Sequence, residues 1–156
     1  MVADAGIVQE VLDLVPQQEP FRFIDEIITL DEEQIHGAYR FREDAFFYRG
    51  HFPGQPITPG VILIETMAQI GVVAFGMYLL ACQKNIRPSQ MKSPLSLFSL
   101  ADNIEFRGIV LPGERVIVKG KKIYFRKGAI KVDLVMEREN GEVVCLGKLA
   151  GMGVEK

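Results

Sequence analysis

One long apolar stretch restricts what this chain can fold into more than any other feature of the sequence. Between residues 61 and 82 the only charged side chain is Glu65, and the polar residues Thr66 and Gln69 follow it closely. The stretch is long enough to cross a bilayer as a helix, but a carboxylate near its start is costly in lipid. Its apolar residues occupy every side of a helix, which is typical of a helix enclosed by protein. We therefore predict a buried helix over about residues 60–81 and no membrane span.

The segment before this helix has a different composition. Residues 47–60 contain three prolines and several glycines, a mixture that disfavours helix and strand and predicts an ordered, irregular loop. The loop leads directly into the helix. Thr58 suits the N-cap of that helix, and Pro59 suits its first position, where a missing N–H costs nothing.

The remaining segments predict one further helix and six strands. Residues Ala5 to Leu14 carry apolar side chains at helical spacing and are followed by Pro16. Strands are predicted at 21–30 and 34–41, then near 95–106, 114–125, 128–138 and 142–153. This order predicts an α+β fold in which one antiparallel sheet curls around one central helix, as a single domain over residues 1–156.

Two side chains are suited to acid–base chemistry. His51 lies in the rigid loop, and an imidazole can remove or deliver a proton near neutral pH. Glu65 lies in the apolar helix, where burial raises the pKa of a carboxyl group and lets it act as a general acid. Two plainer interpretations stay open: His51 as a core histidine held by a backbone carbonyl, and Glu65 as a carboxylate that satisfies Gln69. The other histidine, His36, lies among polar neighbours and is predicted to be solvated.

Gly60 adds a third element at the predicted start of the helix. An amide N–H at that position has no acceptor within the helix and lies at the positive end of the helix dipole. A glycine there admits a substrate carbonyl to close approach, so this amide is suited to polarise a thioester.

Charge and cysteine content exclude several classes of function. The formal net charge of −2 gives no electrostatic reason to expect a nucleic-acid partner. Cys82 and Cys145 have the spacing neither of a metal-ligand pair nor of a disulfide framework, so we expect free thiols in a reducing compartment. The first six residues have no basic segment followed by a long apolar one, so no signal peptide is expected. We therefore predict a cytoplasmic protein without a metal site.

The loop and the helix start together resemble a known signature. The run Gly-His-Phe-Pro-Gly-Gln-Pro-Ile-Thr-Pro-Gly-Val at residues 50–61, followed by Glu-Thr-Met-Ala-Gln at 65–69, is similar to that of the 3-hydroxyacyl-[acyl-carrier-protein] dehydratases. Residues 20–26 and 102–107 resemble two of the family's strands, so the resemblance covers most of the chain. Three positions depart from the family: Thr58 stands where methionine is common, Glu105 where arginine is frequent, and Gly108-Ile109 replaces an Arg-Pro pair.

The resemblance implies a hotdog fold and dimers with two composite active sites, which can assemble as trimers of dimers. It implies that His51 of one subunit faces Glu65 of the other, and a glutamate here is similar to the branch that only dehydrates. It also implies a set of substrate-binding residues: Phe52, Gly60, Val61 and Phe106. The substrate would arrive on the phosphopantetheine arm of an acyl carrier protein, in fatty acid biosynthesis or a related polyene or polyketide pathway, and no cofactor is required.

A basic cluster is suited to receive an acidic carrier protein: Lys119, Lys121, Lys122, Arg126 and Lys127. A solvated strand edge is the plainer interpretation of this cluster. Two other functions stay open. One is an acyl-thioester hydrolase in which Glu65 activates water, and the Gly-His-Phe-Pro-Gly loop argues against it. The other is a non-catalytic subunit of a hetero-oligomeric dehydratase, against which the intact His51 and Glu65 argue.

Overall fold

The computed structural model describes residues 2–92 and 95–154. In chain order its elements are α1 (Ala5–Leu14), β1 (Glu26–Leu30), β2 (Gln34–Arg40), α2 (Gly60–Ala68), the π-helical turn η1 (Gln69–Ala74), α3 (Phe75–Lys84), the 3-10 turn η2 (Pro88–Gln90), β3 (Leu95–Phe106), β4 (Arg115–Arg126), β5 (Ala129–Arg138) and β6 (Val143–Val154). The predicted α+β composition is confirmed.

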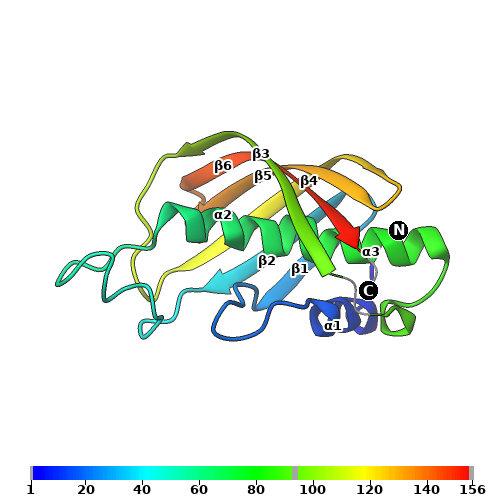
Figure 1. The fold of residues 1–156 in the computed structure, drawn as a ribbon, viewed down its shortest axis with the longest axis horizontal. Coiled ribbons are helices and arrows are strands. Elements are labelled where there is room, and N and C mark those ends of the chain that lie inside the picture. Colours follow the sequence, from blue (N-terminus) through cyan, green and yellow to red (C-terminus); the bar gives the residue numbers. More distant parts are fainter. Residues whose placement is uncertain (1, 93–94, 155–156) are drawn as a thin grey trace.

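The strands form one six-stranded sheet in the order β1-β2-β4-β5-β6-β3, and every neighbouring pair is antiparallel. Figure 1 shows this sheet curved around a long helix. That helix is built from α2, η1 and α3 and runs without a break from Gly60 to Lys84. The arrangement is the predicted hotdog architecture, a sheet wrapped around one central helix.

The long helix forms the core of the protein. Of its most apolar 18-residue window, 72% is buried, and all six residues of η1 are buried. Glycines let the helix approach the sheet closely: a Cβ atom at Gly71 would lie 2.3 Å from Cδ2 of Leu134, and one at Gly37 would lie 2.7 Å from Cγ2 of Ile70. The helix that is apolar enough to cross a membrane is therefore the buried helix that the sequence predicts.

Most predicted strands begin and end within one residue of the observed ones, but the first is shorter than predicted. The strand predicted over 21–30 is β1, which begins at Glu26. The backbone before it is engaged by the central helix, because the Phe23 N–H donates to Oε1 of Gln69 at 2.6 Å and Nε2 of Gln69 donates to the Phe21 carbonyl at 2.9 Å. Polar groups used in this way are not available to extend a strand ladder.

The predicted N-cap of the long helix was wrong. The helix begins at Gly60 with Pro59 as its cap residue, and the Pro59 carbonyl accepts the first intrahelical bonds, from the amides of Ile62 and Leu63 at 2.9 and 3.2 Å. The Thr58 hydroxyl does not cap the helix. It lies 2.6 Å from the Tyr48 hydroxyl in a buried contact, and this competing partner is the reason that the capping geometry is not adopted.

Candidate active site

His51 lies in the irregular loop between β2 and α2. Figure 1 shows this loop at the end of the molecule where the long helix begins. Its Nδ1 atom lies 2.9 Å from the Ile57 carbonyl oxygen, and the Ile57 N–H donates to the His51 carbonyl at 2.8 Å. A carbonyl oxygen can only accept a hydrogen bond, so Nδ1 carries a hydrogen, and in the neutral imidazole the lone pair is then on Nε2. The loop therefore presents His51 in the tautomer that a general base needs.

Phe52 stacks on the His51 imidazole. The two ring centroids are 4.2 Å apart with an interplanar angle of 23°, and a cis peptide bond joins the two residues. The Phe52 side chain is 51% exposed. The sequence-predicted base is thus backed by an aromatic ring on one face and held by a backbone carbonyl at Nδ1.

Glu65 lies on α2, within two turns of its start. Burial raises the pKa of its carboxyl group above the ordinary value of 4.5, and a hydrogen bond from Nε2 of Gln69, at 3.0 Å, opposes that rise. Gln69 is fully buried and is itself fixed by its bonds to the backbone of residues 21–23. Glu65 is therefore a partly buried carboxyl group, oriented by a rigid amide and shifted toward its protonated form.

Gly60 is the first residue of α2, and no hydrogen bond to its N–H is found within the described residues. The ring of Phe106, at the end of β3, lies against it: a Cβ atom at Gly60 would be 2.9 Å from Cε1 and Cζ of that ring. Phe106 is 52% exposed and Val61 is 71% exposed. The start of the helix is therefore an amide at the positive end of a helix dipole, surrounded by apolar side chains open to solvent.

The structure brings some of the predicted site residues together and leaves others apart. His51 contacts Phe52, and Gly60 contacts Phe106. Among the described residues of one chain, no hydrogen bond or ion pair joins His51 to Glu65. The contacts expected for purely structural roles are present: His51 bonds to the Ile57 carbonyl, and Glu65 accepts from Gln69. They engage only Nδ1 of His51 and Oε1 of Glu65, not Nε2 of His51 or Oε2 of Glu65. Those two atoms have no hydrogen-bond partner within the described residues.

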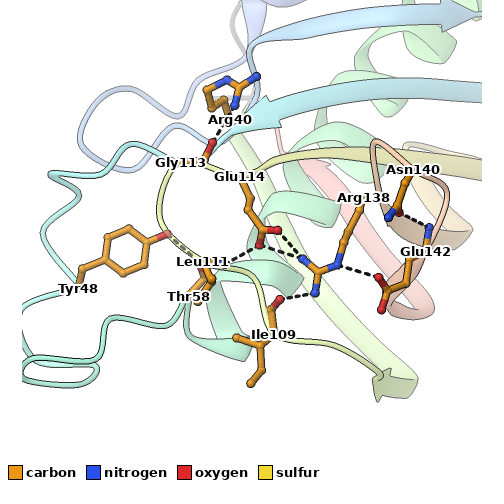
Figure 2. Close-up of polar contacts among 10 residues, drawn as sticks. All are labelled: Arg40, Tyr48, Thr58, Ile109, Leu111, Gly113, Glu114, Arg138, Asn140 and Glu142. Atoms are coloured by element: carbon orange, nitrogen blue, oxygen red, sulfur yellow. Dashed lines mark hydrogen bonds and ion pairs between the residues drawn. The ribbon is translucent and has the colours of Figure 1, made fainter.

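Sequence reasoning missed the groups that tie the His51 loop to the rest of the protein (Figure 2). The buried hydroxyls of Tyr48 and Thr58 lie 2.6 Å apart, and the Thr58 N–H donates to the Val110 carbonyl at 2.9 Å. Arg138 on β5 in turn donates to both Glu114 oxygens, at 2.6 and 2.8 Å, and to the Ile109 carbonyl at 2.5 Å. No local pattern reveals these contacts, because the bonds of Thr58 to Val110 and of Arg138 to Glu114 and Ile109 join segments that are distant in the sequence, and the Tyr48–Thr58 contact spans an irregular loop.

Two other predicted features differ from expectation. His36 is partly buried on β2 rather than solvated, and this burial lowers its pKa. The basic cluster lies on β4 and the turn after it. At Lys119 and Lys121, β4 is an interior strand between β2 and β5, so the strand-edge interpretation was wrong there, whereas Arg126 lies beyond the last residue that pairs with β2. Two of its members are paired with acids: Lys119 lies 3.2 Å from Glu137, and Lys122 lies 3.3 Å from Glu33.

Both cysteines, Cys82 and Cys145, are free thiols, as predicted. Across residues 2–92 and 95–154, no group of three or more histidine, cysteine, aspartate or glutamate side chains is placed to hold a metal ion.

Comparison with known proteins gives consistent matches over most of the chain. Residues 15–148 match the FabA-like domain. The 3-hydroxyacyl-[acyl-carrier-protein] dehydratase FabZ of Caldicellulosiruptor bescii is 30% identical over 143 residues, which are 91% of this chain and 94% of that protein. The enzyme of the same name from Proteus mirabilis is 32% identical over 142 residues, which are 88% of this chain and 87% of that protein.

Solved structures share the fold. The dehydratase heterocomplex ApeI:P of Xenorhabdus doucetiae contains a chain that superposes with a TM-score of 0.74 at 14% identity, over 94% of this chain and 91% of that chain. A hypothetical thioesterase of Streptococcus pneumoniae, solved with coenzyme A, superposes with a TM-score of 0.56 at 11% identity, over 84% and 86% of the two chains. Similarity at this level of identity concerns the architecture alone, which dehydratases and thioesterases share.

Proposed function

Because this chain belongs to the FabA-like family, we propose that it is a 3-hydroxyacyl-[acyl-carrier-protein] dehydratase in which His51 and Glu65 transfer the protons. The observation that carries the proposal is the state of these two side chains in a chain of this family. One is an imidazole with Nδ1 engaged and Nε2 unengaged, and the other is a carboxyl group whose pKa is raised by burial. They are a base and an acid of the kinds that loss of water from a 3-hydroxyacyl thioester requires.

In the proposed reaction, Nε2 of His51 removes a proton from C2 of the acyl chain. The C2–C3 double bond forms as the C3–oxygen bond breaks, and the protonated Glu65 gives its proton to the departing hydroxyl, which leaves as water. The Gly60 amide donates a hydrogen bond to the thioester oxygen, where negative charge develops. The proton on His51 then returns to the Glu65 carboxylate through solvent. Each positioned acid or base contributes about 10²–10⁴-fold to the rate of such a step, and no metal or organic cofactor takes part.

We propose that the substrate reaches this site on the phosphopantetheine arm of an acyl carrier protein in the cytoplasm. Phe52, Val61 and Phe106 then provide apolar contacts for the acyl thioester, since all three are largely exposed beside His51 and Gly60. Arg126, Lys121 and Lys127 form no ion pair with the described acidic residues, which supports this end of the basic cluster as the part that receives an acidic carrier.

We also propose that two copies of the chain build each site. The absence of a contact between His51 and Glu65 within the described part of one chain supports this arrangement. The exposed apolar side chains of Val61 and Phe106 at the helix start support it as well, because a second copy packed there would cover them. The six described strands form one sheet around one central helix, and α1 contacts both β1 and α3, which supports a single domain over residues 1–156.

The direct test is to incubate the purified protein with a 3-hydroxyacyl thioester and separately with the matching 2-enoyl thioester, following both products and free thiol. We expect interconversion of the two thioesters without thiol release, and a His51→Ala protein that keeps its fold and oligomeric state but has no activity. Release of free thiol would instead identify a thioester hydrolase. An inactive protein that gains activity only with a second, different subunit would identify a non-catalytic partner subunit.

A further inference from the structure

The two ends of the His51 loop are joined by the buried hydroxyl groups of Tyr48 and Thr58, and we call this pair of residues the neck of the loop. Tyr48 lies three residues before His51, and Thr58 lies two residues before Gly60. Their hydroxyl oxygens are 2.6 Å apart, and the two side chains are only 5% and 3% exposed (Figure 2). Burial raises the pKa of Tyr48, while the bond to Thr58 opposes that rise. The contact therefore joins the two ends of the loop at a point where water does not compete for either hydroxyl.

This neck is fixed to the sheet by further hydrogen bonds. The Thr58 N–H donates to the Val110 carbonyl at 2.9 Å, in the segment between β3 and β4. Arg138 and Glu114 hold that segment, since Arg138 donates to the Ile109 carbonyl at 2.5 Å and Glu114 accepts from the Leu111 N–H at 2.7 Å. Arg138 is the last residue of β5, so these bonds connect the segment that holds Thr58 to the sheet.

The His51 imidazole and the Gly60 amide are both close in sequence to this neck: His51 is three residues from Tyr48, and Gly60 is two residues from Thr58. Two or three residues span at most about 7–11 Å even when fully extended, so a shift of the neck passes to the His51 ring and to the Gly60 amide together. A misplacement of about 1 Å can lower the rate of a catalysed step by as much as about 100-fold.

We propose that the Tyr48–Thr58 hydroxyl pair positions the His51 imidazole relative to the Gly60 amide, so that both residues are positioning residues that set turnover without contacting the substrate. This inference rests on the proposed dehydratase function. The Tyr48 ring also packs against Phe47, with ring centroids 4.6 Å apart. Replacing Tyr48 with phenylalanine keeps this packing contact and removes only the hydroxyl. The prediction therefore concerns the hydroxyl groups and not the tyrosine ring.

The experiment compares variants that remove one hydroxyl at nearly constant volume: Tyr48→Phe, Thr58→Val and the double variant, with Thr58→Ser as the rescue. The matched control is Thr66→Val, because the buried Thr66 hydroxyl donates to the Ile62 carbonyl at 2.7 Å within α2 and joins no two segments. The measurement is kcat and KM for hydration of 2-butenoyl-coenzyme A, on proteins first shown to be folded by circular dichroism and to have the wild-type oligomeric state.

We expect Tyr48→Phe and Thr58→Val each to lower kcat by about 10- to 100-fold while KM changes little. The double variant should be no worse than the poorer single variant, because both substitutions break the same bond. Thr58→Ser should recover most of the loss, and Thr66→Val should lower stability but leave kcat near the wild-type value. If Thr58→Val does not fold, Tyr48→Phe alone provides the test, since it keeps the ring.

Three results would overturn the positioning role in an active protein: wild-type kcat in both single variants, losses that multiply in the double variant, or an equal loss in Thr66→Val. A wild-type protein that hydrates neither 2-butenoyl-coenzyme A nor the same acyl group on an acyl carrier protein would overturn the proposed function, and this inference with it. The two failures are distinguished by the wild-type protein itself.

Discussion

At the scale of single residues, Glu65 is the group for which stability and function make opposite demands. Its carboxyl group is partly buried on α2, and burial raises its pKa above 4.5. A raised pKa keeps the proton available for a departing hydroxyl group, which favours the reaction. The same environment disfavours the carboxylate, so the folded protein is less stable whenever Glu65 is ionised.

This conflict predicts how the Glu65→Gln variant depends on pH. The folded protein binds the Glu65 proton more tightly than the unfolded chain, so wild-type stability falls as pH rises from about 4.5 to the raised pKa and then stays lower. Glutamine has no ionisable proton, so it makes no such pH-dependent contribution to stability, and its volume is nearly the same. We expect Glu65→Gln to match the wild type below pH 4.5, to exceed its unfolding free energy near neutral pH, and to have little turnover. Urea unfolding at several pH values measures the difference, and a gap that does not change with pH would contradict this origin.

A glycine at position 60 has two separate effects that substitutions can distinguish: it leaves room for the Phe106 ring, and it leaves the backbone amide open to a substrate oxygen. A Cβ atom there would meet the Phe106 ring at 2.9 Å, so Gly60→Ala must displace the ring as well as narrow the approach to the amide. The matched comparison is Phe106→Ala with and without Gly60→Ala, since the ring is then absent in both. We expect the second substitution to lower kcat a further tenfold or more, because a methyl group beside the amide weakens a bond whose complete loss costs about 10²–10³-fold in kcat. Equal turnover in the two proteins would show that the glycine is needed only to accommodate the ring.

At the scale of elements, the long helix shows what the sequence could and could not predict. Its existence and its burial followed from a 22-residue stretch with one charged side chain, because such a helix needs protein on every side. The π-helical turn at Gln69–Ala74 was not predicted, since it depends on how the helix fits against strands that are distant in the sequence. The wrong N-cap has a different cause: Thr58 suits a cap by its position, but its hydroxyl contacts that of Tyr48, ten residues earlier in the irregular loop.

The site was predictable to a similar extent. A confined histidine and a confined glutamate could be identified from the loop and the helix, and so could Gln69 as a neighbour of Glu65. The bonds that orient them could not, because Gln69 reaches the backbone of Phe21 and Phe23, and Thr58 reaches Val110. Residue types and spacing indicate which groups are present, whereas long-range packing decides their orientation.

Two glycines of the same helix provide a matched test of how tightly it fits the sheet. A Cβ atom at Gly71 would lie 2.3 Å from the buried Leu134 side chain, whereas one at Gly76 would come no closer than 3.7 Å to Ile130. We expect Gly71→Ala to destabilise the protein by about 1–3 kcal/mol through overpacking. Gly76→Ala should be neutral or stabilise it by up to about 1 kcal/mol, because alanine favours a helix. Urea midpoints at one subunit concentration measure both, and equal values would show that the helix does not press on β5.

At the scale of the whole molecule, the two edges of the sheet differ. β3 is an edge strand with a row of exposed apolar side chains: Leu95, Leu97, Phe98 and Leu100. An unpaired edge of this kind is a template for pairing with another chain. The edge formed by β1 is shorter, at five residues. We therefore propose that two copies meet along β3, next to the Phe106 ring that covers Gly60.

The comparison of Leu97→Lys with Ile28→Lys tests this assignment, because the two side chains are 54% and 52% exposed on opposite edges. Neither substitution buries a charge in the monomer, so both proteins should fold. We expect Leu97→Lys to sediment as a monomer and to lose activity, because a buried unpaired charge opposes association. Ile28→Lys should keep the wild-type size and activity. Dissociation of Ile28→Lys alone would place the interface on the other edge.

The central claim is that His51 of one subunit and Glu65 of its partner form each active site, and one measurement tests it directly. His51→Ala and Glu65→Gln proteins are each purified, shown to be inactive, mixed in equal amounts, unfolded and refolded together. By two-fold symmetry a mixed dimer contains one site with both lesions and one site with none. About half of the dimers should be mixed, which restores roughly a quarter of the wild-type activity. Demonstrated mixing with no recovery of activity would contradict the shared site, because every site would then retain one lesion.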